Sequence, residues 1–399
     1  MSFRLTHIHD YHRFIAIDFG IYRVRASIYD LSEGALTCTG FSGVRQSRKN
    51  FVQGMVADIG GVSQILEQSI LQAGSQLETI PEDIIMSFPS QSFVSDVLTT
   101  QYTRDDHEAL LTMQEIDSMI KRIENTSYER AKNKSQKQFG TISDDLKLIS
   151  STIVSIQIDG RNVSSPIGFS GGRVRLTVLN IFVPSGEFNI MRSVVSRLDK
   201  QVISLIPQPL ILPKLIENTE AIHSTVCLVD IGYGHTTVTL VSNNEILGFE
   251  TFPYGTEMFM SIIADSHRDY SLLQIENIIC SAQDLKTGDN REYLDEFLDY
   301  IQDAIFGYLK SEKIDMSFKY LYLHGNIFEN SLIYSEFSKR MESSLGYEIK
   351  KKKLYEALDV KIHSDQCTNY GLSLMAKELL FVKKDPLVRI LRYVLYQYE

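Results

Sequence analysis

The sequence predicts an α/β protein made of two related lobes, and two observations carry that prediction. A strand that ends in Asp-x-Gly, followed by a second strand, a turn and a third strand, occurs twice, about 210 residues apart. Segments with apolar residues at helical spacing alternate with these strands. A unit that returns in this way is typical of a duplicated domain.

The first copy lies near the start of the chain. Residues 14–17, 24–29 and 36–41 are predicted strands, and we expect an antiparallel meander because the turns between them are short. Apolar residues at helical spacing predict a helix over residues 61–77 that packs on this sheet. Residues 84–88 are predicted as the next strand.

A charge-rich segment, residues 105–148, interrupts this pattern. Its one stripe of apolar residues predicts a helix over residues 114–124. The polar stretch of residues 122–145 predicts a solvated, mobile loop. Two strands and an amphipathic helix are expected after it, at residues 153–158, 173–183 and 187–198.

The second copy follows a crossover that contains Pro207, Pro209 and Pro213, with a helix expected from about residue 214. A strand over residues 226–229 then ends in Asp230-Ile231-Gly232. Two more strands and a later one complete the pattern, at residues 238–241, 246–252 and 320–323.

Composition limits the class of protein. The chain has 399 residues, enough for two to four domains, and a net charge of −10, which argues against a nucleic-acid partner. Its four cysteines lie far apart, so a disulfide scaffold and a zinc module are both excluded. No apolar run is long enough to span a bilayer, and the polar, His-rich start is unlike a secretory signal. We expect a soluble, cytoplasmic, multidomain protein.

The Asp-x-Gly turns are the candidate chemical sites. Glycine lets the backbone approach an anion closely, and a strand-ending aspartate can hold Mg²⁺ through water. One such turn is more often an ordinary hairpin. Two copies that face each other from related lobes would clamp a nucleotide phosphate chain and its metal.

These residues resemble a known superfamily. Asp18-Phe19-Gly20 is similar to the first phosphate loop of the actin/Hsp70/sugar-kinase ATPases, and Asp230-x-Gly232-x-Gly234-x-Thr236 to the second. His324-Gly325-Asn326 stands where the adenosine loop would lie. Within the superfamily, the element Pro166-Ile167-Gly168-x-Ser170-Gly171 resembles the inserted subdomain of FtsA, the bacterial cell-division actin homologue, and the likeness runs through most of the chain.

The resemblance implies an actin-like, two-lobed α/β ATPase fold of duplicated RNase H-like domains, with an FtsA-type inserted subdomain 1C. The implied divisions are 11–88 for the first part of subdomain 1A, 89–172 for 1C, 173–205 for the return to 1A, 206–256 for 2A, 257–318 for a reduced 2B, 319–382 for the end of 2A and the return to 1A, and 383–399 for a membrane-targeting helix.

The resemblance also implies ATP and Mg²⁺ as cofactors. The implied phosphate and ATP ligands are Asp18, Gly20, Arg23, Asp230, Gly232, Gly234, Thr236 and Gly325, with Asp18 and Asp230 holding the metal through water. The chain departs from the family at Ile21, Tyr233 and Asn326, and the crossover offers only Glu217 as a catalytic candidate. We therefore expect ATP binding with weak or slow hydrolysis at most.

The C-terminal segment predicts an amphipathic helix that begins near Asp385-Pro386. Docking on the core and binding to a membrane explain this pattern equally well, and the FtsA resemblance favours the membrane. The predicted lipid-facing residues are Leu387, Ile390, Leu391, Val394, Leu395 and Tyr398, flanked by Arg389 and Arg392.

The resulting expectation is an FtsA-like cell-division protein that forms filaments on the cytoplasmic face of the membrane at the division site. There it would tether the tubulin-like division GTPase and other divisome proteins of the septum. A PilM-like cytoplasmic adaptor that binds a membrane protein's tail is the alternative, and a sugar or acid kinase is less favoured.

Two further patterns have simpler explanations. His7, His9 and His12 resemble metal ligands but are expected in a polar N-terminal segment without acidic or thiol partners. The run of lysines at 350–353 is expected as a solvated helix or strand end, with anionic lipid as the minor alternative.

Overall fold

The computed structural model describes residues 11–52, 54–89, 91–139, 145–163, 165–311 and 318–381. They form two compact units. Unit 1 takes its residues from Met1–Pro89, Gly186–Lys214 and Asp365–Asp385, and unit 2 from Ser90–Ser185 and Leu215–Ser364. Unit 1 is therefore assembled from three separate stretches of chain.

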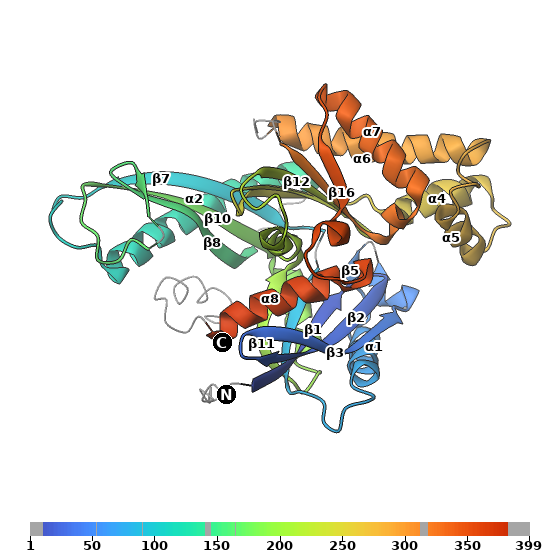
Figure 1. Cartoon of the computed structure of the whole chain (residues 1–399), viewed down its shortest axis with the longest axis horizontal. Coiled ribbons are helices and arrows are strands. Elements are labelled where there is room, and N and C mark those ends of the chain that lie inside the picture. The colour runs from blue at the N-terminus through green and yellow to red at the C-terminus, as the bar shows by residue number, and fades with distance from the viewer. Residues whose placement is uncertain are drawn as a thin grey trace. The chain divides into compact units, whose positions relative to one another are not determined.

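Unit 1 contains a five-stranded sheet (Figure 1). Strands β1, β2 and β3 form the expected antiparallel meander, while β6 runs parallel to β1 and β11 runs parallel to β6. The strands are β1 (Tyr11–Phe19), β2 (Arg23–Ser32), β3 (Ala35–Arg45), β6 (Asp83–Phe88) and β11 (Gln201–Pro207). Between β3 and β6 in the sequence, β4 (Phe51–Val52) and β5 (Met55–Val56) form a separate two-stranded sheet.

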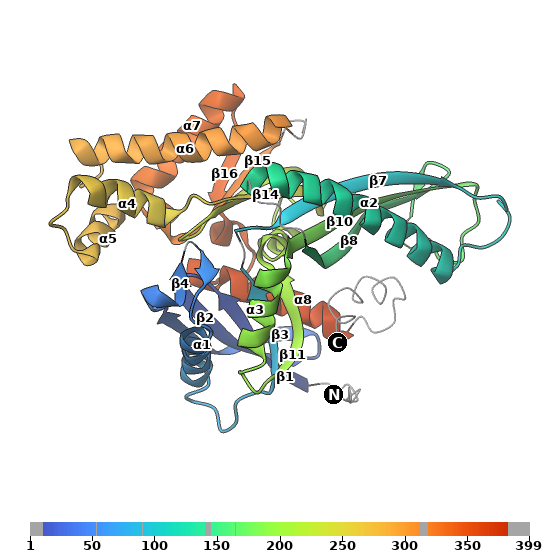
Figure 2. The same cartoon turned by 180° about the vertical axis from the view of Figure 1, so that it is seen from behind.

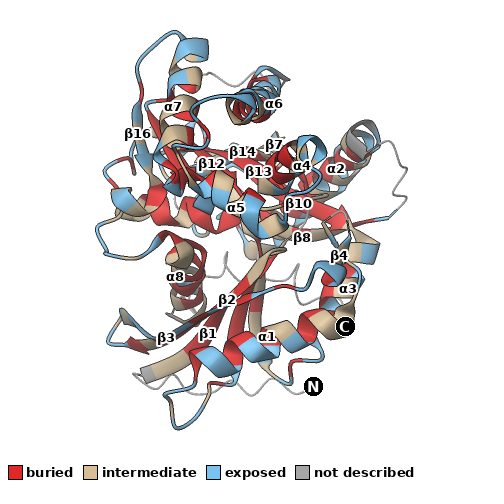
Figure 3. Ribbon diagram, turned by 90° about the vertical axis from the view of Figure 1, so that its right-hand side faces the viewer, coloured by how far each residue is buried: buried red, intermediate tan, exposed pale blue. Residues whose placement is uncertain are grey.

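Helices cover both faces of this sheet (Figures 2 and 3). Helix α1 (Ile59–Ala73) packs on β2 and β3, on the same side as α3 (Ser185–Val195), and α8 (Cys367–Phe381) packs on the opposite face. The fully buried Asn369 fixes α8 there, since its Nδ2 donates to the carbonyl oxygen of Ala16 at 2.9 Å and to that of Arg25 at 3.2 Å. The core of unit 1 is thus closed by the last described helix.

Unit 2 repeats the topology of unit 1 strand for strand. Strands β12, β13 and β14 form an antiparallel meander, β15 runs parallel to β12, and β16 runs parallel to β15. The predicted duplication of the strand pattern is confirmed by this match. The strands are β12 (Thr225–Ile231), β13 (Thr236–Ser242), β14 (Glu245–Phe252), β15 (Tyr320–His324) and β16 (Lys350–Lys353).

Helices bury one face of the second sheet. Alternate residues of β12, β13 and β15 pack against four helices, with Phe259 and Phe297 stacked at 4.9 Å between ring centres. Helices α6 and α7 lie side by side (Figures 1 and 2). The four are α4 (Thr256–Ser266), α5 (Leu272–Cys280), α6 (Asp289–Ser311) and α7 (Ser331–Leu345).

Short 3-10 helices connect the longer elements. The helix expected from about residue 214 is one of these, since the prolines of the crossover favour tight turns over an α-helix. They are η1 (Arg48–Asn50), η2 (Gln208–Leu210), η3 (Leu212–Asn218), η4 (Asn326–Glu329), η5 (Leu354–Ala357) and η6 (Ser364–Gln366).

An additional layer is inserted between β6 and α3. Its four-stranded sheet has the order β7-β10-β8-β9 and carries α2 on one face. Because β10 pairs with both β7 and β8, the inserted sheet extends to Pro184, later than the boundary expected at residue 172. Its elements are β7 (Val94–Thr103), α2 (Met113–Phe139), β8 (Leu146–Ile158), β9 (Arg161–Asn162) and β10 (Arg173–Pro184).

Helix α2 corrects the prediction of a mobile loop after residue 124, because the helix continues to Phe139. The apolar stripe of its first half is followed by buried Ser127, Ala131 and Ser135, which keep the helical spacing of four residues. Small residues allow close packing on the sheet, where Asn180 Nδ2 donates to Ser127 Oγ at 3.0 Å. The composition of this stretch is polar, although its buried face is continuous.

The inserted layer belongs to unit 2 and docks on the edge strand β14. Ser95 Oγ donates to the carbonyl oxygen of Phe249 at 2.8 Å, and the rings of Phe93 and Phe249 meet edge to face. Lys134 on α2 forms an ion pair with Glu250 at 3.1 Å. The insert interrupts unit 1 in sequence but packs on the second sheet in space.

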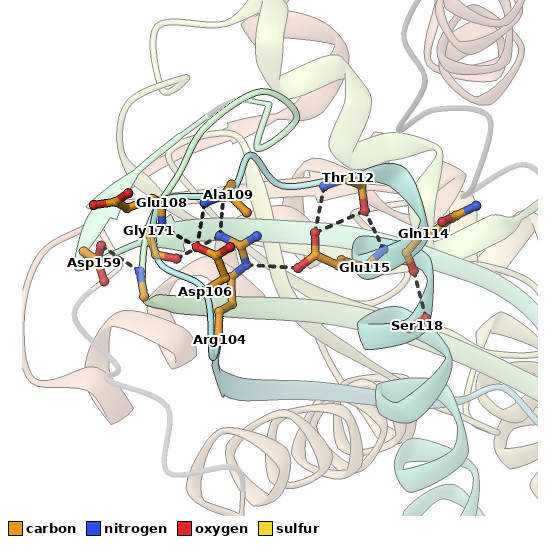
Figure 4. Close-up of polar contacts among 11 residues, drawn as sticks. Arg104, Asp106, Glu108, Ala109, Thr112, Gln114, Glu115, Ser118, Asp159 and Gly171 are labelled. Carbon is orange, nitrogen blue, oxygen red and sulfur yellow. Dashed lines mark hydrogen bonds and ion pairs between the residues drawn. The ribbon is translucent and has the colours of Figure 1, made fainter.

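Arg104 organises the loops at the far end of the inserted layer (Figure 4). Its side chain, only 6% exposed, donates from Nε to Glu115 at 3.0 Å and from Nη1 to the carbonyl oxygens of Ala109 and Gly171, at 2.8 and 3.0 Å. The Gly171 contact includes the Pro166–Gly171 element in this network. The element singled out in the sequence therefore helps to close the loops of the insert.

Two predicted features lie outside the described residues: the C-terminal helix of 383–399, with all eight of its membrane residues, and the histidines at positions 7 and 9. Within the described part of the chain, no helix combines the length and apolar character needed to cross a bilayer. The metal-like pattern at the N-terminus has one described member, His12, which pairs with Asp83 at 2.9 Å.

The lysine run is the edge strand β16. Each lysine has a partner: Lys350 lies over the ring of Tyr320, and the other three form ion pairs with glutamates at 2.5 to 3.3 Å. Charged side chains on an edge strand discourage pairing with another sheet. The run is thus a protected sheet edge.

Candidate functional site

In unit 1, the first Asp-x-Gly turn lies at the carboxyl end of β1. Since β1, β6 and β11 are parallel, their carboxyl ends share this edge of the sheet. A Cβ on Gly20 would lie 2.5 Å from the carbonyl oxygen of Arg23, so the turn requires glycine. The amide of Phe19 donates to Ser87 Oγ on β6 at 2.8 Å, which ties the turn to the neighbouring strand.

Asp18 is buried in an ion-pair chain that the sequence did not reveal. It lies opposite Arg25 across the hairpin, and Arg25 Nη1 donates to Asp18 Oδ2 at 3.2 Å. Arg25 Nη2 donates to Asp365 Oδ1 at 2.9 Å. One guanidinium therefore joins two carboxylates at the first turn.

Arg23 follows the same turn at the start of β2. Its Nε is buried and has no hydrogen-bond partner among the residues that the structure describes. The same is true of the Nε of Arg25. Both arginines therefore keep an unsatisfied donor inside the fold, on the strand that follows the first turn.

In unit 2, the second turn lies at the carboxyl ends of β12 and β15. Asp230 lies beside His324 in the parallel register, and its Oδ1 is 2.8 Å from His324 Nδ1. Gly325 has φ +118°, and a Cβ there would lie 2.1 Å from the carbonyl oxygen of Ile231. Only glycine allows the end of β15 to approach the second turn so closely.

The backbone of the second turn is held from three sides. The amide of Gly232 donates to the carbonyl oxygen of His235 at 2.9 Å, and the amide of Thr256 donates to that of Gly232 at 3.0 Å. Gln91 Nε2, at the start of the inserted layer, donates to the carbonyl oxygen of Gly234 at 3.0 Å. The turn is therefore fixed before any ligand arrives.

Thr236 and His235 face the protein interior. Thr236 is fully buried, and its hydroxyl donates to the carbonyl oxygen of Tyr254 at 2.7 Å, so this proton is already used within the fold. Burial lowers the pKa of His235, with Asp230 opposing the shift, and its Nδ1 has no partner in the described part of the chain. His235 is thus a neutral imidazole inside the turn.

The structure does not support Glu217 as a catalytic residue. Its Oε1 accepts from Asn244 Nδ2 at 2.8 Å, in the turn between β13 and β14. That turn lies at the opposite end of the β12–β13 hairpin from Asp230. Asp230 is about six residues along the strands from this turn, and at ~3.3 Å each they are separated by roughly 20 Å. Glu217 is therefore too far away to contact a water molecule that Asp230 binds.

Gln208 is a candidate that sequence reasoning missed. It directly follows β11, so it lies at the same edge of the first sheet as Asp18 and Gly20. The two intervening strand spacings, ~4.8 Å each, place it about 10 Å from the first turn. Its buried Oε1 has no partner within the described residues. The sequence signal that could have identified Gln208 was its position between Pro207 and Pro209, which indicates the end of a strand.

A metal ion finds few protein ligands here. Among the described residues, no group of three or more His, Cys, Asp or Glu side chains could hold one. Asp18 does not fit as a Mg²⁺ ligand, because its carboxylate is already paired with Arg25. Asp230 shares one oxygen with His324 and fits an outer, water-mediated contact with a metal that a nucleotide brings.

Comparison with known proteins places the chain by its fold. No protein-family model matches it. The cell division protein FtsA of Streptococcus pneumoniae is 23% identical over 242 residues, which are 58% of this chain and 48% of that protein. The chain thus spans about half the length of this curated relative.

Among solved structures, the PilM–PilN type IV pilus biogenesis complex matches with a TM-score of 0.63 and 14% identity, over 92% of this chain and 97% of that one. MreB5 of Spiroplasma citri bound to AMPPNP matches with a TM-score of 0.47 and 12% identity, over 92% and 97%. The first likeness shows the fold and leaves the role open.

Proposed function

We propose that this chain, which has the actin-like ATPase fold, is a nucleotide-binding scaffold of the FtsA type. One observation carries the proposal: each unit has its own five-stranded sheet of the same topology, with an Asp-x-Gly turn at the corresponding edge. A duplicated anion-binding turn is suited to a ligand with several phosphates. ATP is the ligand proposed.

The proposed contacts use backbone and cationic groups. Gly20 and Gly232 would allow phosphates to approach the two turns, and Arg23 would contribute its positive charge beside the first. Asp230 would contact Mg²⁺ carried by the nucleotide, through water, and Gly325 would lie beside the base. Thr236 and Gly234 support the second turn from within.

Slow hydrolysis follows from the same groups. Gln208 is proposed to orient the attacking water, because an amide can both donate and accept a hydrogen bond. Glutamine cannot act as a strong base, and no described carboxylate is assigned to that task. ATP then serves mainly as a ligand that stabilises one conformation.

The proposed role is cell division, as in the FtsA protein that the chain resembles. The chain would form filaments, bind the cytoplasmic face of the membrane through residues 383–399, and tether the tubulin-like division GTPase and other divisome proteins. Filaments would multiply the weak attachment of one short helix.

A PilM-like adaptor is the second candidate, favoured by the structural likeness over nearly the whole length of both chains. In that role the chain would stay unpolymerised and bind the tail of a membrane protein.

Binding, vesicle pelleting and electron microscopy test the proposal together. Saturable binding of a fluorescent ATP analogue, with filaments on anionic vesicles, supports the FtsA-type scaffold. Removal of residues 386–399 should abolish pelleting while leaving nucleotide binding intact. Nucleotide binding without filaments or pelleting would favour the adaptor, and the absence of nucleotide binding would refute the nucleotide-binding scaffold.

A further inference from the structure

We infer that Arg25 is a built-in cation that takes the place of Mg²⁺ beside Asp18, so that nucleotide binding at the first turn is independent of the metal. This inference rests on the proposed nucleotide binding and deepens it. It assigns a role to a residue that the sequence motif does not contain.

The geometry of the ion pair is the first argument. The Arg25 guanidinium spans Asp18 at 3.2 Å and Asp365 at 2.9 Å, with side chains that are 15% and 8% exposed for Arg25 and Asp18. Arginine stays protonated at every physiological pH. The carboxylate that would attract a hydrated Mg²⁺ is therefore permanently compensated, and a divalent cation there would also meet the guanidinium charge.

The duplicated hairpin supplies an internal comparison. In unit 2 the residue opposite Asp230 is Thr237, which is neutral. The same Asp-x-Gly hairpin therefore forms without a cation at this position. Arg25 is thus a feature of the first turn that the fold itself does not require.

The local charge balance is the third argument. Arg23 and Arg25 offset Asp18 and Asp365, so these four residues carry no net charge. Each arginine has a buried Nε–H without a partner among the described residues. A phosphate oxygen that reaches the turn would meet a carboxylate that is already neutralised, and would need no metal to screen it.

The test compares binding of a fluorescent ATP analogue with excess Mg²⁺ and with excess EDTA, using the full chain. For the unchanged protein we expect dissociation constants that agree within about twofold, because the proposed contact between Asp230 and the metal is only water-mediated and Asp230 already shares one oxygen with His324. In Arg25→Gln, the ion pair with Asp18 is lost, so the charge of this carboxylate is no longer offset by Arg25 and repels the triphosphate. Binding in EDTA should then weaken by at least about tenfold, and Mg²⁺ should restore it.

Two further variants separate this effect from a general loss of folding. In Asp18→Asn/Arg25→Gln, the carboxylate charge is also removed, so metal-free binding should return. Arg13→Gln is the matched control, because Arg13 pairs with Asp30 across the same two strands, at 2.9 Å, at the end away from the turn. Its binding should remain insensitive to EDTA.

The outcomes are distinct. Loss of binding by the unchanged protein in EDTA, with recovery in Mg²⁺, overturns this inference and leaves the proposed function standing. Metal-independent binding by Arg25→Gln overturns the role of Arg25. Absence of binding under both conditions overturns the inference and the proposed function together.

Discussion

Replacement of Gly325 by alanine tests how the second turn is built. Gly325 has φ +118°, which L-residues rarely adopt, and its new Cβ would lie 2.1 Å from the carbonyl oxygen of Ile231. The backbone strain costs about 1–3 kcal/mol and relief of the contact a similar amount. We therefore expect Gly325→Ala to lower the free energy of unfolding by roughly 4 kcal/mol.

The clash can be relieved only if the end of β15 moves away from β12. That movement would separate His324 from Asp230, which are 2.8 Å apart. Urea denaturation followed by circular dichroism measures the loss of stability. Binding of a fluorescent ATP analogue, below the unfolding transition, measures the effect on the turn and should weaken as well.

Gly346→Ala is the matched control in the same unit. Gly346 also has a positive φ, +77°, but a Cβ at this position would have no neighbouring atom within 4 Å among the described residues. Only the backbone strain remains, so the expected cost is about 1 kcal/mol. Equal destabilisation by the two substitutions would refute the argument from the close approach of β15.

Three other predictions concern the packing and the ionisation described above. Asn369→Ala removes the donor to two carbonyl oxygens in the first sheet and should lower the free energy of unfolding, measured by urea denaturation, by about 2–3 kcal/mol. An unchanged free energy of unfolding would show that α8 is loosely held. Ala131→Leu should destabilise the protein by about 1–3 kcal/mol, because the larger side chain overpacks the contact between α2 and its sheet. Asn133→Leu is the control and should be neutral, because Asn133 is exposed. Equal effects of the two substitutions would contradict the packing of α2 on the sheet. The pKa of His235 is lowered in the folded state, so stability should fall as pH drops below the ordinary histidine pKa of 6.5, by at most about 1.4 kcal/mol per pH unit. Urea midpoints of His235→Phe should show a smaller decrease than the unchanged protein between neutral and mildly acidic pH; an identical decrease would refute this assignment.

The duplicated hairpins could be predicted because their signals are local. Alternating strands, short turns and glycines stand within a few residues of one another, and the structure confirms them in both units. The positions of β11 and β16 could not be predicted, since parallel pairing joins distant segments. The second half of α2 was missed because its buried face consists of Ser127, Ala131 and Ser135.

The same distinction holds for the candidate site. The turn glycines and both aspartates follow from the motif, whereas Arg25 and His324 become partners only through strand register. Gln208 depends on the order of parallel strands, which the sequence does not state. Glu217 was chosen because it lies in the crossover. That position in the sequence does not reveal which end of the β12–β13 hairpin Glu217 contacts.

The assembly of unit 1 from three stretches has a consequence for synthesis on the ribosome. Strands β1, β2, β3 and β6 of the first sheet emerge early, but Asn369, which holds α8 against them, is 353 residues away from Ala16 along the chain. At about 5–20 residues per second, the nascent sheet would wait roughly 20–70 s for its covering helix. During that interval an apolar surface is open to chaperones, and the second unit can finish folding before the first.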